Sequence, residues 1–309
     1  MNVDDYSRRE FCQVITTGAA MVVLAPQTLM AAETTMLKRK VPATGEELPV
    51  IGLGTSGVFD VGGGSSERAP LMEVLRILAG AGGSLLDTSP MYNRSEAVSG
   101  DLMAALELRN RMFVATKVWT RGKEEGLEQI ATSMRLLKSP KLDLVQVHNL
   151  LDLGTQLANV RALKEQGKVR YCGITHYTVA SHTDLEGVIQ REPVDFVQFN
   201  YSIATRQAEQ RLLPLAAERK VAVLINRPFE DGALFARVRG KPLPAWATEI
   251  DCTSWAQFFL KFIVSHPAVT CVIPATAKPA HMADNVRAGH GRMPDDKMRE
   301  RMAAYVASL

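Results

Sequence analysis

The chain has 309 residues, of which 46% are hydrophobic and 22% charged, and its formal net charge at pH 7 is +3. This composition is typical of a globular protein with a sizeable core, and the charge is too small to indicate binding to nucleic acid or to a membrane surface. The six histidines and four cysteines show no spacing typical of a metal site, so we expect no bound metal.

Residues 1–33 differ from the rest of the chain. Arg8 and Arg9 form a twin-arginine pair, and the apolar segment 14–32, interrupted by Pro26, follows them. This pattern resembles a Tat export signal, the type that carries folded proteins across a membrane, and it does not favour a stable membrane span. The sequence therefore predicts the Tat export machinery as a partner and a periplasmic location. A cytoplasmic location is the alternative if the segment is not a working signal.

From residue 34 to residue 309 we expect a single domain that begins with a β-hairpin. Segments 37–41 and 47–50 flank a short turn that contains proline and glycine. Eight short apolar runs follow, typical of strands, at residues 50–54, 84–87, 112–118, 142–148, 169–175, 194–200, 221–225 and 270–274.

Longer segments with helical spacing separate these runs. They lie at residues 68–81, 95–109, 124–138, 156–166, 180–191, 207–219 and 253–265, and two more follow the last run, at 280–287 and 295–307. Runs that are apolar throughout are typical of strands covered on both faces. Eight strand–helix units in series predict an α/β fold, a closed (β/α)₈ TIM barrel. An open, doubly wound sheet is the alternative, but no GxGxxG fingerprint follows a strand.

Two segments are expected to form loops at the mouth of the barrel. The glycine-rich segment 57–66 is predicted to be mobile, and the segment 230–251 is predicted to be an extended loop. Four aromatic residues are candidates to line an apolar mouth, although core packing explains the last of them equally well: Phe59, Trp119, Trp246 and Trp255.

Three polar residues end successive predicted strands. Asp87 ends the second strand, Lys117 the third and His148 the fourth, and Tyr92 follows five residues after Asp87. Because the carboxyl ends of barrel strands share one face, we expect these side chains to be neighbours. Each residue alone is more readily explained as a cap, a solvated charge or a core histidine, and only their shared placement favours a site.

This combination suits the reduction of a carbonyl group. A phenol has a pKa near 10, and a nearby ammonium lowers that value by favouring the phenolate. A carboxylate beside the ammonium keeps it charged, and an imidazole within reach can orient a carbonyl oxygen. The hydride must come from a cofactor, because no side chain supplies one.

The sequence resembles the aldo/keto reductases over about residues 36–290. The segments that carry the resemblance are ATGEELPVIGLGT (43–55), LLDTSPMYNRSE (85–96), VATKVW (114–119), LVQVHN (144–149), GITHY (173–177), FVQFNYS (196–202) and IPATAKPAHMADN (273–285). The resemblance implies a reductase in which Tyr92 is the general acid. It also implies that Lys117 and Asp87 tune this tyrosine and that His148 orients the substrate carbonyl.

The resemblance also implies a nicotinamide nucleotide as the cofactor, NADPH being expected and NADH being the alternative. The positions that would hold it are Thr175, His176, Gln198, Asn226, Arg227, Thr276, Lys278, His281 and Asn285. Thr175 and His176 replace the family's usual Ser-Asn pair. Asn226 and Arg227 stand in the string that commonly supplies an aromatic platform for the nicotinamide.

The expected substrate is a small aldehyde or ketone of mixed type rather than a charged sugar phosphate. Two alternatives come from other classes. A catalytically weak barrel could bind the nucleotide and act as a sensor or subunit. A barrel isomerase or lyase would bind no nicotinamide at all.

Overall fold

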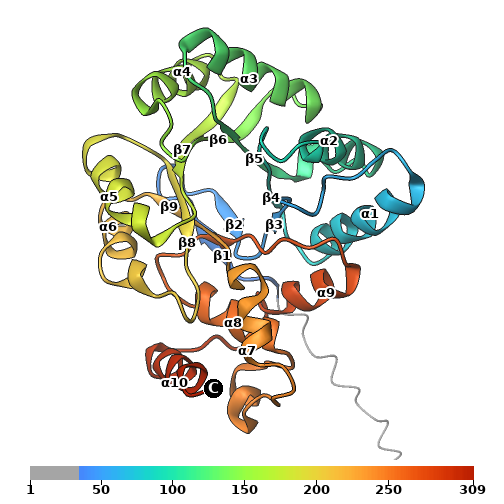
Figure 1. Ribbon diagram of the computed structural model, residues 1–309, viewed down its shortest axis with the longest axis vertical. Helices are drawn as coiled ribbons and strands as arrows, with labels where there is room; N and C mark the ends of the chain where they lie inside the picture. The colour runs from blue at the N-terminus through green and yellow to red at the C-terminus, as the bar shows by residue number, and fades with distance from the viewer. Residues whose placement is uncertain (1–34) are drawn as a thin grey trace, which may run out of the picture. The chain divides into compact units, whose positions relative to one another are not determined.

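The computed structural model describes residues 35–309, so the predicted export signal lies outside the described residues and stays a prediction. Eight parallel strands follow one another in chain order: β3 (Leu53–Gly54), β4 (Leu85–Asp87), β5 (Phe113–Val118), β6 (Leu142–His148), β7 (Val169–Thr175), β8 (Phe196–Asn200), β9 (Ala222–Asn226) and β10 (Cys271–Val272). Parallel bridges from Ile51 to Val272 and from Gly54 to Ala275 join the first strand to the last. The predicted (β/α)₈ barrel is therefore confirmed (Figure 1).

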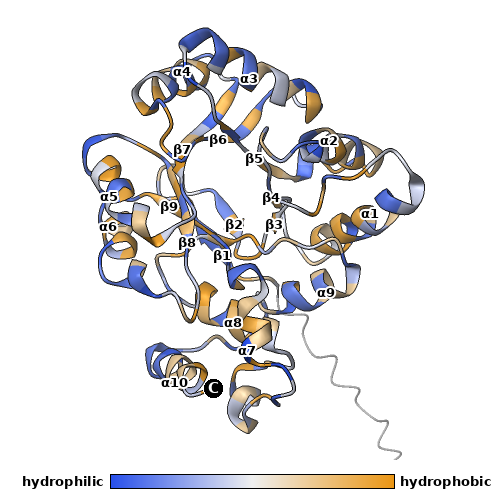
Figure 2. Cartoon of the chain, viewed as in Figure 1, coloured by the Kyte–Doolittle hydropathy of each residue, from blue (hydrophilic) through white to orange (hydrophobic). Residues whose placement is uncertain are grey.

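The helices surround the strands (Figure 1). They are α1 (Ser65–Gly80), α2 (Ser95–Ala105), α3 (Lys123–Leu136), α4 (Leu153–Glu165), α5 (His182–Arg191), α6 (Leu212–Glu218), α7 (Ala233–Arg237), α8 (Trp255–Val264), α9 (Pro279–Arg287) and α10 (Asp296–Ala307). Figure 2 shows hydrophobic and hydrophilic residues on the same helices, as expected for helices with one buried and one solvated face. Within residues 35–309, no helix is long and apolar enough to cross a bilayer.

The nine predicted helices are all present, with ends that differ by a few residues. α6 begins only at Leu212, which places Pro214 in its first turn, where a missing backbone N–H is tolerated. The prediction of an extended loop over 230–251 was wrong in part. This segment contains α7 and two 3₁₀ turns, Glu230–Gly232 and Ala245–Ile250.

The predicted hairpin is confirmed and covers the N-terminal end of the barrel. β1 (Lys38–Lys40) pairs antiparallel with β2 (Glu47–Pro49). Val41 and Leu48 of the hairpin are buried in one apolar cluster with interior residues such as Leu144. This cluster fills the N-terminal part of the barrel interior. A second, larger core lies between the strands and the helices.

The alternation of side chains along each strand explains why the barrel interior is polar near the C-terminal ends of the strands. On β6, Val145 and Val147 belong to the core outside the barrel, whereas Leu144 belongs to the interior core. Successive side chains of a strand point to opposite faces, so Gln146 and His148 follow Leu144 on the inward face. The interior therefore changes from apolar to polar toward the C-terminal ends of the strands.

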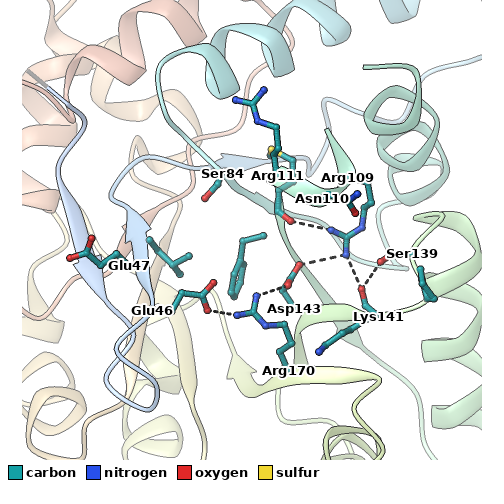
Figure 3. Close-up of a pocket in the computed structure, with 14 residues that line it drawn as sticks. Glu46, Glu47, Ser84, Arg109, Asn110, Arg111, Ser139, Lys141, Asp143 and Arg170 are labelled. Carbon is teal, nitrogen blue, oxygen red and sulfur yellow. Dashed lines mark hydrogen bonds and ion pairs between the residues drawn. The ribbon is translucent and has the colours of Figure 1, made fainter. Parts of the chain in front are cut away.

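A charged pocket of about 360 Å³ lies at the opposite, N-terminal end of the barrel (Figure 3). Arg170 donates hydrogen bonds to Glu46 of the hairpin, at 2.5 Å, and to Asp143 of β6, at 2.8 Å. Asp143 lies 3.5 Å from Arg109 and also accepts the backbone N–H of Val114. Because these charges pair with one another, the network ties the hairpin to the barrel wall.

Candidate active site

A cavity of about 790 Å³ opens at the C-terminal ends of the strands, where barrel enzymes carry their active sites. Asp87, Tyr92 and His148 line it. Lys117 is fully buried and contacts the first two of these residues. The structure therefore brings together the three predicted strand-end residues and Tyr92.

Lys117 and Asp87 form a buried ion pair next to Tyr92. The Lys117 Nζ donates to Asp87 Oδ1 at 2.6 Å and to the backbone oxygen of Thr88 at 2.8 Å, and it lies 5.1 Å from the centre of the Tyr92 ring. Burial opposes the positive charge, but attraction to Asp87 and Tyr92 outweighs burial and holds the pKa of Lys117 above its ordinary value. The ammonium therefore stays charged beside the phenol.

His148 lies against Tyr92 as a neutral ring. The two ring centres are 6.4 Å apart in an edge-on arrangement, and His148 Nδ1 lies 3.5 Å from Ser89 Oγ. Burial, and after it the positive charge of Lys117, lowers the pKa of His148 to about 3. At neutral pH the imidazole can orient a carbonyl oxygen by hydrogen bonding, but it carries no extra proton to give.

The lowered pKa of His148 predicts part of the acid sensitivity of the fold. The unfolded chain protonates this histidine near pH 6.5 and the folded chain only near pH 3, so the unfolded state binds more protons between these values. Stability is therefore lost as the pH falls through this window, by about 1.4 kcal/mol per pH unit. We expect His148→Gln to lose less free energy of unfolding than the wild type between pH 7 and pH 4.5. Urea unfolding at both pH values measures this, and an equal loss in the two proteins would contradict the assignment.

Two glutamines and two further polar residues extend the site from Asp87 across the barrel. Asp87 Oδ2 accepts hydrogen bonds from Gln198 Nε2 at 2.9 Å and from Gln146 Nε2 at 3.2 Å. Gln198 Oε1 in turn accepts from Thr175 Oγ1 at 3.0 Å and from Asn226 Nδ2 at 3.3 Å. The proposed proton-handling residues are thus continuous with residues predicted to bind the cofactor.

Four of the predicted cofactor-binding residues line the cavity, namely Thr175, Gln198, Asn226 and Arg227. Asn226 Nδ2 also donates to the backbone oxygen of His176 at 3.0 Å. Its Oδ1 is buried and, among the described residues, has no hydrogen-bond partner. A buried acceptor without a partner fits a donor brought by a ligand, such as the amide of a nicotinamide.

The side chain of His176 does not line the cavity. Its Nδ1 accepts the backbone N–H of Tyr177 at 2.9 Å, its Nε2 lies 3.0 Å from Ser181 Oγ, and its ring stacks on Tyr177. His176 therefore supports the neighbouring Tyr177, which does line the cavity.

The remaining predicted cofactor residues lie on the segment from β10 into α9, outside the lining of the cavity: Thr276, Lys278, His281 and Asn285. Thr276 Oγ1 accepts the backbone N–H of Lys278 at 3.0 Å. Lys278 is exposed and immediately precedes α9, so its charge lies at a helix N-terminus, where anions are favoured.

The glycine-rich segment 57–66, predicted to be mobile, is hydrogen-bonded to the segment that follows Tyr92. Asp60 accepts from Arg94 Nε at 2.7 Å and from Asn93 Nδ2 at 2.9 Å. These contacts connect the loop after β3 to the loop that carries the phenol.

The aromatic mouth was predicted only in part. Trp119 lines the cavity and is 42% exposed, but Phe59 is fully buried in the core. Trp246 and Trp255 pack against Phe258 on α8 and do not line the cavity. The prediction was therefore wrong for Trp246, whereas Trp255 has the core packing that was its alternative. Other large residues line the mouth instead: Met91, Tyr177, Phe229 and Phe235. Phe235 belongs to α7, in the segment that was predicted to be a loop.

A family model and several curated relatives match most of the chain. The model of a family described as the aldo/keto reductase family matches residues 50–305. The aldo-keto reductase YhdN of Bacillus subtilis is 26% identical over 210 residues, which cover 63% of this chain and 62% of that protein. The methylglyoxal reductase YeaE of Escherichia coli is 29% identical over 248 residues, which cover 77% and 84%. An NADH-specific methylglyoxal reductase of Escherichia coli is 27% identical over 315 residues, which cover 88% and 94%.

Solved structures resemble the chain in fold. The crystal structure of an aldo-keto reductase from Klebsiella pneumoniae in complex with NADPH matches with a TM-score of 0.72 at 23% identity. The match covers 88% of this chain and 96% of that one.

Proposed function

The chain belongs to the aldo/keto reductase family, and we propose that it reduces a small aldehyde or ketone with NADPH, using Tyr92 as the general acid. The relatives support an NAD(P)H-dependent carbonyl reductase, and two of them are named as methylglyoxal reductases. The observation that carries the proposal is the buried ion pair of Lys117 and Asp87, whose ammonium lies 5.1 Å from the centre of the Tyr92 ring.

The nicotinamide nucleotide, when bound, supplies a hydride to the carbonyl carbon. The residues of the chain manage the proton. Tyr92 gives its proton to the carbonyl oxygen, and the charge of Lys117 stabilises the phenolate that remains. Asp87 keeps the ammonium charged and in place. Neutral His148 donates a hydrogen bond that orients the carbonyl oxygen.

The residues fit the cofactor at both of its ends. Thr175, Gln198 and Asn226 would hold the amide of the nicotinamide, and the buried oxygen of Asn226 without a partner supports this role. Arg227 lines the cavity and would meet a phosphate. Lys278, which immediately precedes α9, would hold the adenine end together with Thr276, His281 and Asn285 of the same segment. One relative is named as NADH-specific, so NADH is the alternative.

The exposed Lys278 makes the preference for NADPH testable. If its ammonium meets the 2′-phosphate, Lys278→Met should weaken the binding of NADPH about tenfold, because one charge-assisted contact is lost. The affinity for NADH, which lacks this phosphate, should stay within about twofold. Fluorescence titration of both nucleotides measures this, with Lys297→Met on α10 as the matched control. An unchanged NADPH affinity, or an equal loss for both nucleotides, would assign the 2′-phosphate to other residues.

The direct test of the proposed function is to titrate the purified protein with NADPH and then add methylglyoxal or another aldehyde. We expect the bound nucleotide to be oxidised. Asn226 in place of an aromatic platform is the observation that favours a nucleotide-binding sensor or subunit. Tight binding of NADPH without oxidation by any aldehyde would support that alternative, and no binding of NADPH or NADH would exclude both.

The location of the protein is proposed from residues 1–33 alone, which lie outside the described residues. Arg8 and Arg9 support export of the folded, cofactor-loaded protein by the Tat machinery. We expect the wild type in the periplasmic fraction and the double variant Arg8→Lys, Arg9→Lys in the cytoplasmic fraction. Finding both proteins only in the cytoplasm would rule out the signal.

A further inference from the structure

Gln146 is a buried amide in the barrel interior, and it takes no direct part in the proposed proton and hydride transfers. It lies on β6, two residues before His148 on the same inward face, and it has no solvent exposure. Its Nε2 donates to Asp87 Oδ2 at 3.2 Å, and its Oε1 accepts from Gln198 Nε2 at 3.4 Å. Both ends of the amide therefore contact residues of the candidate active site.

The neighbouring strand leaves room for this side chain. Gly173 on β7 pairs directly with Gln146, and a Cβ added at Gly173 would lie 3.0 Å from Gln146 Cγ and 3.0 Å from the backbone oxygen of Phe196. Glycine inside a strand is unfavourable unless something approaches the backbone closely. An apolar side chain could fill the same space without the cost of burying an amide. Gly173 thus leaves room for a long side chain at position 146, and the two hydrogen bonds of its amide distinguish Gln146 from an apolar residue of the same size.

The charge of Asp87 dictates how both amides are oriented. An ionised carboxylate only accepts hydrogen bonds, so Gln146 and Gln198 must both turn their NH₂ groups toward it. The oxygen of Gln146 takes a second hydrogen of the Gln198 amide. As a result, Gln198 presents its Oε1 toward Thr175 and Asn226, the side of the cavity where a nicotinamide amide would bind.

We propose that Gln146 is a positioning residue that holds the Asp87 carboxylate and the Gln198 amide in the orientation that the reaction needs. This inference rests on the proposed carbonyl reduction. It adds that the proton-handling and cofactor-handling sides of the site are coupled through one amide pair inside the barrel. Gln146 acts through Asp87 and Gln198 and does not itself contact the substrate.

Gln146→Met keeps the size of the side chain but removes its hydrogen bonds. We expect kcat to fall at least about tenfold, as for the loss of one hydrogen bond to a charged group. We expect KM for the aldehyde to change less than about threefold, because no substrate contact is lost. The dissociation constant of NADPH, titrated without aldehyde, should rise about fivefold as Gln198 loses its fixed orientation.

Gln146→Glu separates a positioning role from simple packing. At neutral pH a second carboxylate beside Asp87 cannot donate, so kcat should fall further than in Gln146→Met. As the pH is lowered, the protonated carboxyl can donate again, and kcat should rise toward the wild-type value. Besides the introduced group, the titratable groups around Asp87 are Lys117, Cys271, Tyr92 and His148. The wild type carries the same four groups. The effect of the introduced carboxyl is therefore measured as the difference between the pH profiles of kcat for Gln146→Glu and for the wild type.

The matched control is Gln156→Met. Gln156 is a fully buried amide on α4, outside the barrel, and its Nε2 donates to the backbone oxygen of Gly122 at 2.8 Å. We expect it to cost stability without changing kcat or the affinity for NADPH. Wild-type kcat and NADPH affinity in Gln146→Met, with no recovery of Gln146→Glu at low pH, would overturn the inference. If the wild type binds NADPH but reduces no aldehyde, the proposed function fails and the inference about Gln146 is still tested. A weaker NADPH affinity in Gln146→Met than in Gln156→Met would then support the positioning role, and equal affinities would overturn it.

Discussion

Replacing Tyr92 by phenylalanine is expected to lower kcat for the reduction of an aldehyde by about 10³-fold. The variant loses only the hydroxyl that we propose gives the proton, while Lys117, Asp87 and His148 keep their positions. The proposed nicotinamide contacts of Thr175, Gln198 and Asn226 are unchanged, so the dissociation constant of NADPH should stay within about twofold. Steady-state kinetics and a fluorescence titration on the same preparation measure the two quantities.

The matched control for this prediction is Tyr305→Phe, the same chemical change at a tyrosine on α10 that stacks on Trp255 away from the cavity. It should leave kcat unchanged. A Tyr92→Phe enzyme that keeps wild-type turnover would remove Tyr92 from the role of general acid. Another proton donor, such as water, would then have to be found for the carbonyl oxygen.

Lys117→Met should have the second-largest effect, and it should act on stability as well as on rate. Asp87 is 2% exposed, and without Lys117 its charge would be held only by the two glutamine amides. A buried ion pair that loses one partner typically costs 3–5 kcal/mol, so we expect the free energy of unfolding to fall by about 3 kcal/mol. We expect kcat to fall by about 10²-fold or more, because nothing then stabilises the phenolate.

The double variant Asp87→Asn, Lys117→Met distinguishes these two effects. Removing both charges together should restore much of the lost stability, since no uncompensated charge remains buried. Activity should stay low, because the ammonium is still missing. Urea unfolding and steady-state kinetics of the two single variants and the double variant measure this. Recovery of both stability and rate in the double variant would contradict a catalytic role for Lys117.

The part of the site that was predictable from the sequence follows from strand ends. A short apolar run that closes on Asp87, Lys117 or His148 defines both a strand and the end of that strand, and barrel geometry then places all three at one mouth. Thr175, Gln198 and Asn226 also end a strand or lie near its end, but they were assigned to the cofactor from the resemblance to the aldo/keto reductases. These residues line or adjoin the cavity as expected.

The part that was not predictable depends on contacts between distant segments. In the sequence Gln146 looks like one polar residue within an apolar strand, and only the structure reveals its hydrogen bond to Asp87 across the barrel. The signal that could have found it is its place on the same strand face as His148, next to a glycine in the following strand. Phe229 and Phe235 reach the mouth because the segment after β9 folds into α7 instead of an open loop.

Asn226, at the end of β9, stands where the resemblance to the aldo/keto reductases predicts an aromatic platform for the nicotinamide. Asn226 donates from its amide nitrogen to Gln198 and to the backbone of His176, and its buried oxygen has no hydrogen-bond partner among the described residues. Tyr177 lies in the same cavity, and the Arg227 guanidinium lies over its ring at 5.8 Å. The chain therefore offers polar contacts at the position where the family resemblance predicts a stacking surface.

The most direct test of carbonyl reduction with Tyr92 as the proton donor is a single-turnover experiment on protein loaded with NADPH. Wild type and Tyr92→Phe are each mixed with an excess of methylglyoxal, and the decay of the bound nucleotide is followed in H₂O and D₂O. We expect rapid oxidation in the wild type, slowed in D₂O because a proton moves in the same step, and almost none in the variant. Equal oxidation rates in the two proteins, or no oxidation by any aldehyde in a wild type that binds NADPH, would contradict proton transfer from Tyr92 to a carbonyl substrate.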